Sequence, residues 1–167
     1  MIWILYADRI YTLYGDKFEL MNKYHGGSRI AVDKDNTIIL GVDPFLVSIS
    51  NNNFIDTIFR PNVNDYKAFA DIAIDMDNSV WFRRHNDDGI RKYTTDTIIY
   101  HTSQHHIFQF GSLSDMNIDS LGNIWVCGFK NIYKFEAGTE RWIDILAEYS
   151  DKLNEEYSYN GIEFDSE

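Results

Sequence analysis

The sequence contains one cysteine, Cys127, in 167 residues. A lone cysteine excludes an internal disulfide framework and is typical of a reducing compartment. No apolar run approaches the roughly 18 to 20 residues that a membrane-spanning helix needs. The apolar N-terminal run, residues 1–6, has no basic region before it and soon meets Asp8 and Arg9, unlike a signal peptide. We therefore expect a cytoplasmic protein with no membrane segment.

Basic residues are few, 15 against 26 acidic residues, so the formal net charge is -11. A surface of this sign repels phosphates, which argues against nucleic acid or an anionic membrane as a partner. Hydrophobic residues make up 44% and aromatic residues 16% of the chain, which excludes a disordered protein. The length predicts a single domain over residues 1–167.

Recognisable catalytic motifs are also missing. The sequence has no Gly-x-Ser-x-Gly, no glycine-rich phosphate loop and no His-Glu-x-x-His. Cys127 follows Trp125 in an apolar segment, where a small buried side chain is expected. We expect no catalytic residues, no metal site and no cofactor, and hence a non-enzymatic protein.

A short pattern recurs three times along the chain. Each copy has two apolar residues, two positions apart, followed by an aspartate, and alternation of this kind is typical of a half-buried strand. The copies are 30–33, 72–75 and 116–119. Three residues after each aspartate stands Asn36, Asn78 or Gly122, residue types that tolerate the positive φ of a tight hairpin turn.

Each copy is followed by three further strand-like segments. The second strand carries Ile39, Trp81 or Trp125, six residues after the aspartate. The third is marked by apolar pairs three residues apart, Leu46 and Ile49, Ile90 and Tyr93, Ile132 and Phe135. We expect the fourth at 54–59, 97–100 and 141–146. Short polar turns join the strands, which predicts antiparallel four-stranded meanders.

The two ends of the chain complement each other. Residues 1–21 resemble a copy without its first strand, and residues 162–165 repeat the first-strand pattern with Asp165. The four aspartates are 42, 44 and 46 residues apart, near the length of a propeller blade. We predict an all-β, four-bladed β-propeller, closed by the C-terminal strand pairing with the N-terminal blade. An open solenoid or sandwich is the alternative, and it leaves both ends unpaired.

The segment 116–125, followed by Gly128 and 131–135, resembles the repeats of two-component-regulator propellers and is similar to streptogramin-lyase-type repeats. Residues 75–81 and 89–93 form a weaker copy. The resemblance implies a propeller fold. The lyases imply a histidine base with Mg²⁺, but no motif here assigns that role to a residue.

The repeated aspartates allow two interpretations. They could line an axial channel and hold a cation, since hard cations prefer carboxylate oxygens. Their fixed place before a turn residue instead favours acceptance of backbone N–H groups within the turn. We prefer the turn role.

The histidines and a group of basic residues are expected to be solvated rather than to form a site. The five histidines are expected in solvated loops rather than at a metal: His25, His85, His101, His105, His106. The basic residues Arg83, Arg84, Arg91 and Lys92 are expected on a solvated strand face near Asp87 and Asp88.

The acidic residues are concentrated at the C-terminal end. Residues 144–167 carry a net charge of -7, and a short helix is possible over 146–157. Tyrosines among carboxylates are typical of interfaces, although a charge run is usually only solvated. The candidate partner-binding residues are Asp144, Glu148, Tyr149, Asp151, Glu155, Glu156, Tyr157 and Tyr159.

These features favour a protein-binding module with a basic partner. An acidic immunity protein that neutralises a bacterial toxin domain, such as a basic nuclease, fits this description. One alternative is a small-ligand or sugar-binding propeller that uses aromatic residues between blades: Trp3, Trp81, Trp125, Trp142. A lyase-type enzyme is the third class.

Overall fold

The computed structural model describes most of the chain in two compact units, residues 1–72 (unit 1) and 73–167 (unit 2). The described residues are 2–6, 9–14, 17–23, 27–50, 55–62, 65–87, 89–95, 97–102, 113–129, 131–149, 159 and 161–164. Each unit is described by itself. The single domain expected over 1–167 stays a prediction.

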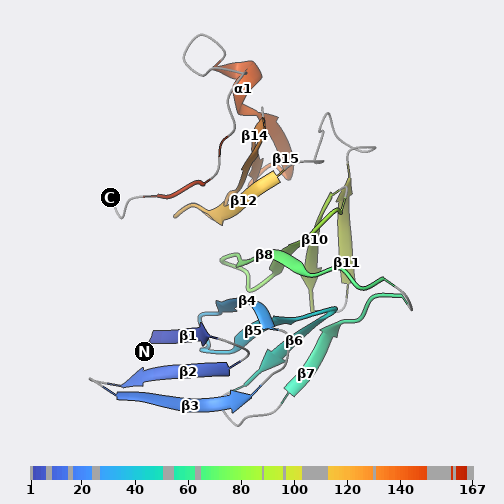
Figure 1. Cartoon of the computed structure of the whole chain (residues 1–167). Coiled ribbons are helices and arrows are strands. Elements are labelled where there is room, and N and C mark those ends of the chain that lie inside the picture. Colours follow the sequence, from blue (N-terminus) through green and yellow to red (C-terminus); the bar gives the residue numbers. More distant parts are fainter. Residues whose placement is uncertain are drawn as a thin grey trace. The chain divides into compact units, whose positions relative to one another are not determined.

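Unit 1 contains two antiparallel sheets of consecutive strands (Figure 1). The first has the order β1-β2-β3, with β1 (Ile2–Tyr6), β2 (Arg9–Tyr14) and β3 (Lys17–Lys23). The second has the order β4-β5-β6-β7, with β4 (Gly27–Val32), β5 (Ile38–Val42), β6 (Phe45–Ile49) and β7 (Ile55–Phe59). These are the meanders that the alternating pattern predicts.

Two further antiparallel sheets follow. One has the order β11-β10-β9-β8, with β8 (Phe69–Ile74), β9 (Val80–Arg84), β10 (Gly89–Thr94) and β11 (Thr97–Thr102). The other has the order β12-β13-β14-β15, with β12 (Leu113–Ile118), β13 (Ile124–Gly128), β14 (Asn131–Glu136) and β15 (Arg141–Asp144). The boundary between the units falls within β8. The all-β class and the strand order are confirmed.

The turns after the first strands have the predicted backbone. Asn36, Asn78 and Gly122 have φ values of 60°, 62° and 81°. Asparagine and glycine adopt this left-handed region at the lowest steric cost. The recurrent spacing therefore identified the turns correctly.

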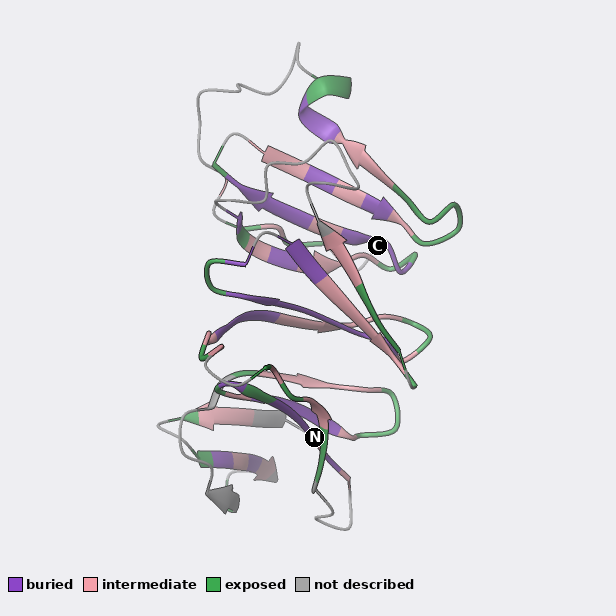
Figure 2. Ribbon diagram, turned by 90° about the vertical axis from the view of Figure 1, so that its right-hand side faces the viewer, coloured by how far each residue is buried: buried purple, intermediate pink, exposed green. Residues whose placement is uncertain are grey.

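Apolar side chains form a core in each unit. In unit 2 the buried cluster joins residues of both sheets, among them Trp81, Ile90, Val126 and Phe135. In unit 1 a smaller cluster includes Ile10 and residues of β5 and β6. Strand β9 is buried along its whole length. Figure 2 shows the buried residues (purple) mainly within strands and the exposed residues (green) mainly at the turns. No helix of the described residues has the length and hydropathy required to cross a membrane.

The fourth strand of the last sheet is shorter than expected. We expected it to reach Leu146, but β15 ends at Asp144 and the one-turn helix α1 (Ile145–Glu148) follows. The Asp144 carboxylate caps this helix by accepting the Ala147 N–H at 3.1 Å. A cap of this kind competes with continued strand pairing. The rest of the helix expected over 146–157 lies mainly outside the described residues.

Pairing of residues 162–165 with the N-terminal sheet is not observed. Ile162–Phe164 belong to no strand, and Asp165 lies outside the described residues. The Ile162 N–H instead donates to Asp115 Oδ2 and its carbonyl accepts from Asn117 Nδ2, each at 2.9 Å. Both side chains belong to β12. Closure therefore remains a proposal.

Candidate functional site

The repeated aspartates organise their own turns. Asp119 Oδ1 accepts the backbone N–H groups of Leu121 at 3.0 Å and Asn123 at 2.9 Å. Asp75 and Asp33 accept equivalent pairs, two and four residues further on. No group of three or more potential metal ligands occurs in the described part of the chain. The turn role that we preferred is confirmed by these hydrogen bonds.

An indole group completes two of these turns. Asp119 Oδ2 accepts the Nε1–H of Trp125 at 2.8 Å, and Asp75 Oδ2 accepts that of Trp81 at 2.8 Å. Through this hydrogen bond, the tryptophan six residues after the aspartate connects the turn to the second strand. The spacing was visible in the sequence, but the hydrogen bond was not inferred from it.

The Asp119 carboxyl has a lowered pKa. Burial, the largest single influence, acts to raise the pKa, but hydrogen bonds from Trp125, Asn123 and Leu121 together outweigh it. These bonds stabilise the ionised form. Asp119 is therefore held as a carboxylate acceptor.

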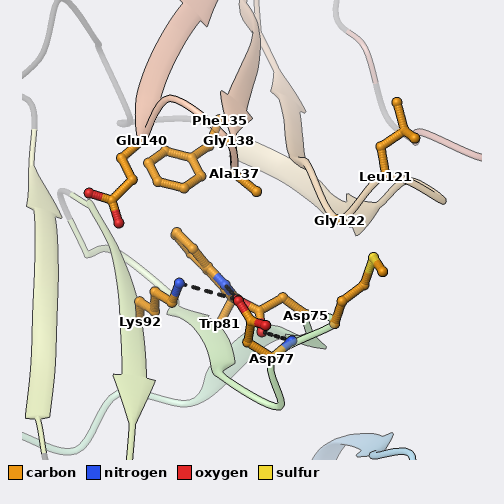
Figure 3. A pocket seen from close by; sticks show the side chains of 11 residues that line it. Asp75, Asp77, Trp81, Lys92, Leu121, Gly122, Phe135, Ala137, Gly138 and Glu140 are labelled. Atoms are coloured by element: carbon orange, nitrogen blue, oxygen red, sulfur yellow. Dashed lines mark hydrogen bonds and ion pairs between the residues drawn. The ribbon is translucent and has the colours of Figure 1, made fainter.

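A pocket of about 340 Å³ lies over these turns in unit 2 (Figure 3). Three turns surround it: 75–79 between β8 and β9, 119–123 between β12 and β13, and 136–140 between β14 and β15. Its wall also includes Trp81, Lys92 and Phe135. We call it the turn pocket.

Lys92 supplies the positive charge in this wall. Its Nζ lies 3.3 Å from Asp75 Oδ2 and 5.0 Å from the centre of the Trp81 ring. The amine thus pairs with the turn aspartate and covers the indole face. Asp77 and Glu140 add two exposed carboxylates to the lining.

The other basic residues differ from our expectation of a solvated strand face. Arg83 and Arg84 are buried, at 8% and 1% exposure. Arg84 Nε lies 3.1 Å from Asp87 Oδ2, which also pairs with Arg91. The expected proximity to Asp87 is therefore correct, but solvation is wrong, because two arginines share a carboxylate with only 2% side-chain exposure.

The histidine interpretation is partly wrong. His85 is exposed on the β9–β10 turn, as expected. His101, however, lies in β11 and stacks on Trp81, with ring centres 5.3 Å apart, and meets Phe135 and Trp142 edge-on. Ring packing between the sheets of unit 2 keeps it from being a solvated loop residue. His25, His105 and His106 lie outside the described residues.

Three of the four candidate tryptophans pack against other side chains in the described part of the chain. Trp81 is 1% exposed, and Trp142 packs on Phe135 at 5.3 Å. The Trp125 ring contacts Phe164 at 5.8 Å. The side chain of Trp3 lies outside the description. Cys127 is fully buried, as expected.

The acidic C-terminal segment is described in part. Glu148 and Tyr149 are exposed, whereas Asp144 caps α1. Tyr159 is half-buried, and its N–H donates to the Gly128 carbonyl at 3.0 Å. The remaining candidates lie outside the described residues: Asp151, Glu155, Glu156, Tyr157.

Solved structures resemble this chain throughout most of its length. Virginiamycin B lyase from Staphylococcus aureus matches with a TM-score of 0.66 and 17% identity, over 85% of this chain and 50% of the lyase. The extracellular domain assigned to a one component system of B. thetaiotaomicron matches with a TM-score of 0.65 and 17% identity, over 95% of this chain and 22% of that domain. The fold is that of a β-propeller.

The extracellular domain assigned to a hybrid two component system of B. thetaiotaomicron matches with a TM-score of 0.63 and 10% identity, so the expected resemblance to both propeller groups is confirmed at the level of fold. A streptogramin B lyase also matches, with a TM-score of 0.66 and 15% identity. The chain spans about half the length of these lyases. No protein-family model and no curated protein matches the sequence.

Proposed function

We propose that this β-propeller chain is a non-enzymatic protein-binding module with a basic partner. The observation that carries the proposal is the anchoring of the acidic C-terminal segment. Asp115 and Asn117 of β12 hold the backbone of Ile162, and Trp125 contacts Phe164. Contacts on both sides of Glu163 hold this exposed carboxylate at a lower entropic cost than a free tail would.

The same C-terminal segment carries exposed acidic and aromatic side chains. Glu148 and Glu163 are exposed, and Tyr149 and Phe164 are 43% and 37% exposed. Aromatic side chains among charges combine contact area with electrostatic attraction to a basic surface. The net charge of -7 over residues 144–167 supports the same partner.

The finer proposal is an immunity protein that binds a bacterial toxin domain such as a basic nuclease. It rests on the acidic charge and the small size, and the names of the structural neighbours do not support it. A cytoplasmic location belongs to this proposal. The lyase alternative is not favoured, since the likeness to lyases concerns the fold.

The test uses a basic toxin domain encoded next to this gene, and the absence of any toxin gene there would count against the immunity role. Titration calorimetry of the full chain against that domain, at about 0.05 M and 0.5 M salt, should show binding that weakens strongly with salt. The variant Glu148→Gln/Glu163→Gln should bind more weakly than the control Glu19→Gln/Asp56→Asn, which removes two exposed acids from unit 1. Salt-insensitive binding, or equal loss in both variants, would contradict the proposed interface.

We also propose that residues 162–165 complete the three-stranded sheet β1–β3 and so close a four-bladed ring. Successive first strands of the repeat are in contact at another place. Arg29 of β4, four residues before Asp33, donates to the Ala70 carbonyl of β8.

Asp115 of β12, four residues before Asp119, also contacts the backbone of a later segment, but as the acceptor of the Ile162 N–H. In both cases a side chain of one first strand contacts the backbone of the segment before the next aspartate of the repeat. This similarity supports a first-strand role for residues 162–165.

Deletion of residues 160–167 tests the closure. The truncated chain should lose hydrogen-exchange protection of the β1 amides and should unfold at lower denaturant concentration. A truncated chain with unchanged protection and stability would refute closure.

A further inference from the structure

The turn pocket exposes two large apolar side chains. Met76 is 67% exposed and Leu121 is 77% exposed. They belong to neighbouring turns, and Met76 Sδ lies 3.4 Å from the position that a Cβ of Gly122 would occupy. Exposed apolar side chains gathered at a pocket are typical of a binding site.

The pocket is also acidic. Asp77 and Glu140 are exposed carboxylates, while the Lys92 amine is already paired with Asp75 at 3.3 Å. The ionisable groups of the lining therefore sum to a net negative charge. In Figure 3, Glu140 and Leu121 lie toward opposite ends of the pocket and Asp77 lies between them, so a carboxylate is close to the apolar side chains.

This arrangement is complementary to one kind of side chain. Arginine and lysine combine a long apolar stem with a terminal cation. The stem can pack on Met76 and Leu121 while the cation pairs with Glu140 or Asp77. Phosphates and other anions are disfavoured by the charge. A sugar would need an open aromatic face, but Trp81 and Phe135 are 1% and 5% exposed.

We propose that the turn pocket receives an arginine or lysine side chain of the protein partner. This inference rests on the proposed function, because it assumes that the partner is a basic protein. It adds a second contact surface, formed by turns rather than by the C-terminal segment.

The probe is the peptide acetyl-Gly-Arg-Gly-amide, titrated into the full ¹⁵N-labelled chain and followed by NMR. The indole N–H of Trp81 and the backbone amides of Asp77, Gly122 and Gly138 should shift in a saturable manner. The matching citrulline peptide keeps the shape of arginine and removes its charge. It should bind about three- to tenfold more weakly, the change expected when the combined attraction of two exposed carboxylates for the cation is lost.

Two charge-matched variants locate the site. Asp77→Asn/Glu140→Gln should weaken the arginine peptide by the same three- to tenfold factor. Glu19→Gln/Asp56→Asn removes the same charge from unit 1 and should leave peptide binding unchanged. Both pairs are exposed, so neither variant removes a core contact.

The outcomes separate this inference from the proposed function. Equal binding of the arginine and citrulline peptides would overturn it, as would shifts confined to residues outside the pocket or an equal loss of binding in the two variants. A basic partner protein that binds the Asp77→Asn/Glu140→Gln variant with unchanged affinity would overturn the pocket and leave the proposed function intact. If the arginine peptide binds in the pocket but the basic partner protein binds neither the pocket nor the C-terminal segment, the proposed function alone is refuted.

Discussion

Asp119 receives four hydrogen bonds and is the best single test of how the repeat is held together. Its carboxylate accepts the backbone N–H groups of Leu121 and Asn123, the side-chain amide of Asn123 and the indole of Trp125. The perturbation is the replacement Asp119→Ala, with Asp119→Asn as the conservative variant. Both should destabilise unit 2.

The size of the effect follows from the burial of the donors. Leu121 is exposed, so water can replace its partner, whereas Asn123 is buried and Trp125 is half-buried. Loss of the acceptor for each of these less exposed donors lowers the free energy of unfolding by about 1 kcal/mol or more. Asp119→Ala should therefore lower it by about 2 to 4 kcal/mol in total. Asparagine has one acceptor oxygen and one amide donor group, so it cannot serve both the turn and the indole. Asp119→Asn should therefore cost about 1 to 3 kcal/mol.

The dependence on pH has a definite sign. The hydrogen bonds, which outweigh burial, lower the pKa of Asp119 below the ordinary value of 3.8. The ionised carboxylate therefore contributes stability that is fully present above the unfolded-state pKa and is lost as the pH falls through the lower folded-state pKa. The difference in unfolding free energy between the wild type and Asp119→Asn should be constant above about pH 5 and shrink below about pH 4.

Urea unfolding followed by far-ultraviolet circular dichroism measures these differences. A double-mutant cycle with Trp125→Phe isolates the indole bond, and the coupling energy should be about 1 kcal/mol. A coupling near zero would refute the anchoring role of the indole. A difference that does not change with pH would refute the lowered pKa as its source.

Three further predictions concern packing and docking. Asp87→Ala should lower the free energy of unfolding by about 3 to 5 kcal/mol, because it removes a buried carboxylate shared by Arg84 and Arg91. A loss below about 1 kcal/mol in urea unfolding would contradict this. Gly89→Ala should lower the melting temperature, because its Cβ would meet the His101 carbonyl oxygen. The control Gly138→Ala, whose Cβ would have nothing within 4 Å, should not. Equal melting temperatures of the two variants would contradict the predicted clash. Asp115→Ala/Asn117→Ala should expose the C-terminal segment to limited proteolysis after Tyr159, since both bonds to Ile162 are lost, and an unchanged cleavage rate would show that the clamp is dispensable.

The turns and strand order could be predicted from the sequence because their causes are local. An aspartate that accepts two nearby backbone N–H groups, with Asn78 or Gly122 at a positive φ, needs only a few consecutive residues. The alternation of apolar residues likewise defines strands from neighbouring positions. The sequence did not predict the end of β15 at Asp144, because Ile145 and Leu146 suit a strand or a helix equally well.

The candidate site depended on contacts between distant residues. The apolar and acidic parts of the turn pocket come from Met76, Asp77, Leu121 and Glu140, which lie on three separate turns. The sequence shows each of them as an ordinary turn residue. The partner-binding prediction for the C-terminal segment remains a prediction, and its anchor on β12 could be seen only in the structure.

The sequence by itself determined the repeat, the β-strands, the aspartate turns and the strong acidic charge, because these depend on short-range patterns and on composition. Only the tertiary structure decided that His101 packs among Trp81, Phe135 and Trp142 and that Arg84 is buried against Asp87. The physical reason is burial: whether a polar side chain meets water or a neighbouring sheet depends on residues tens of positions away in the chain. The same residue types suit either environment.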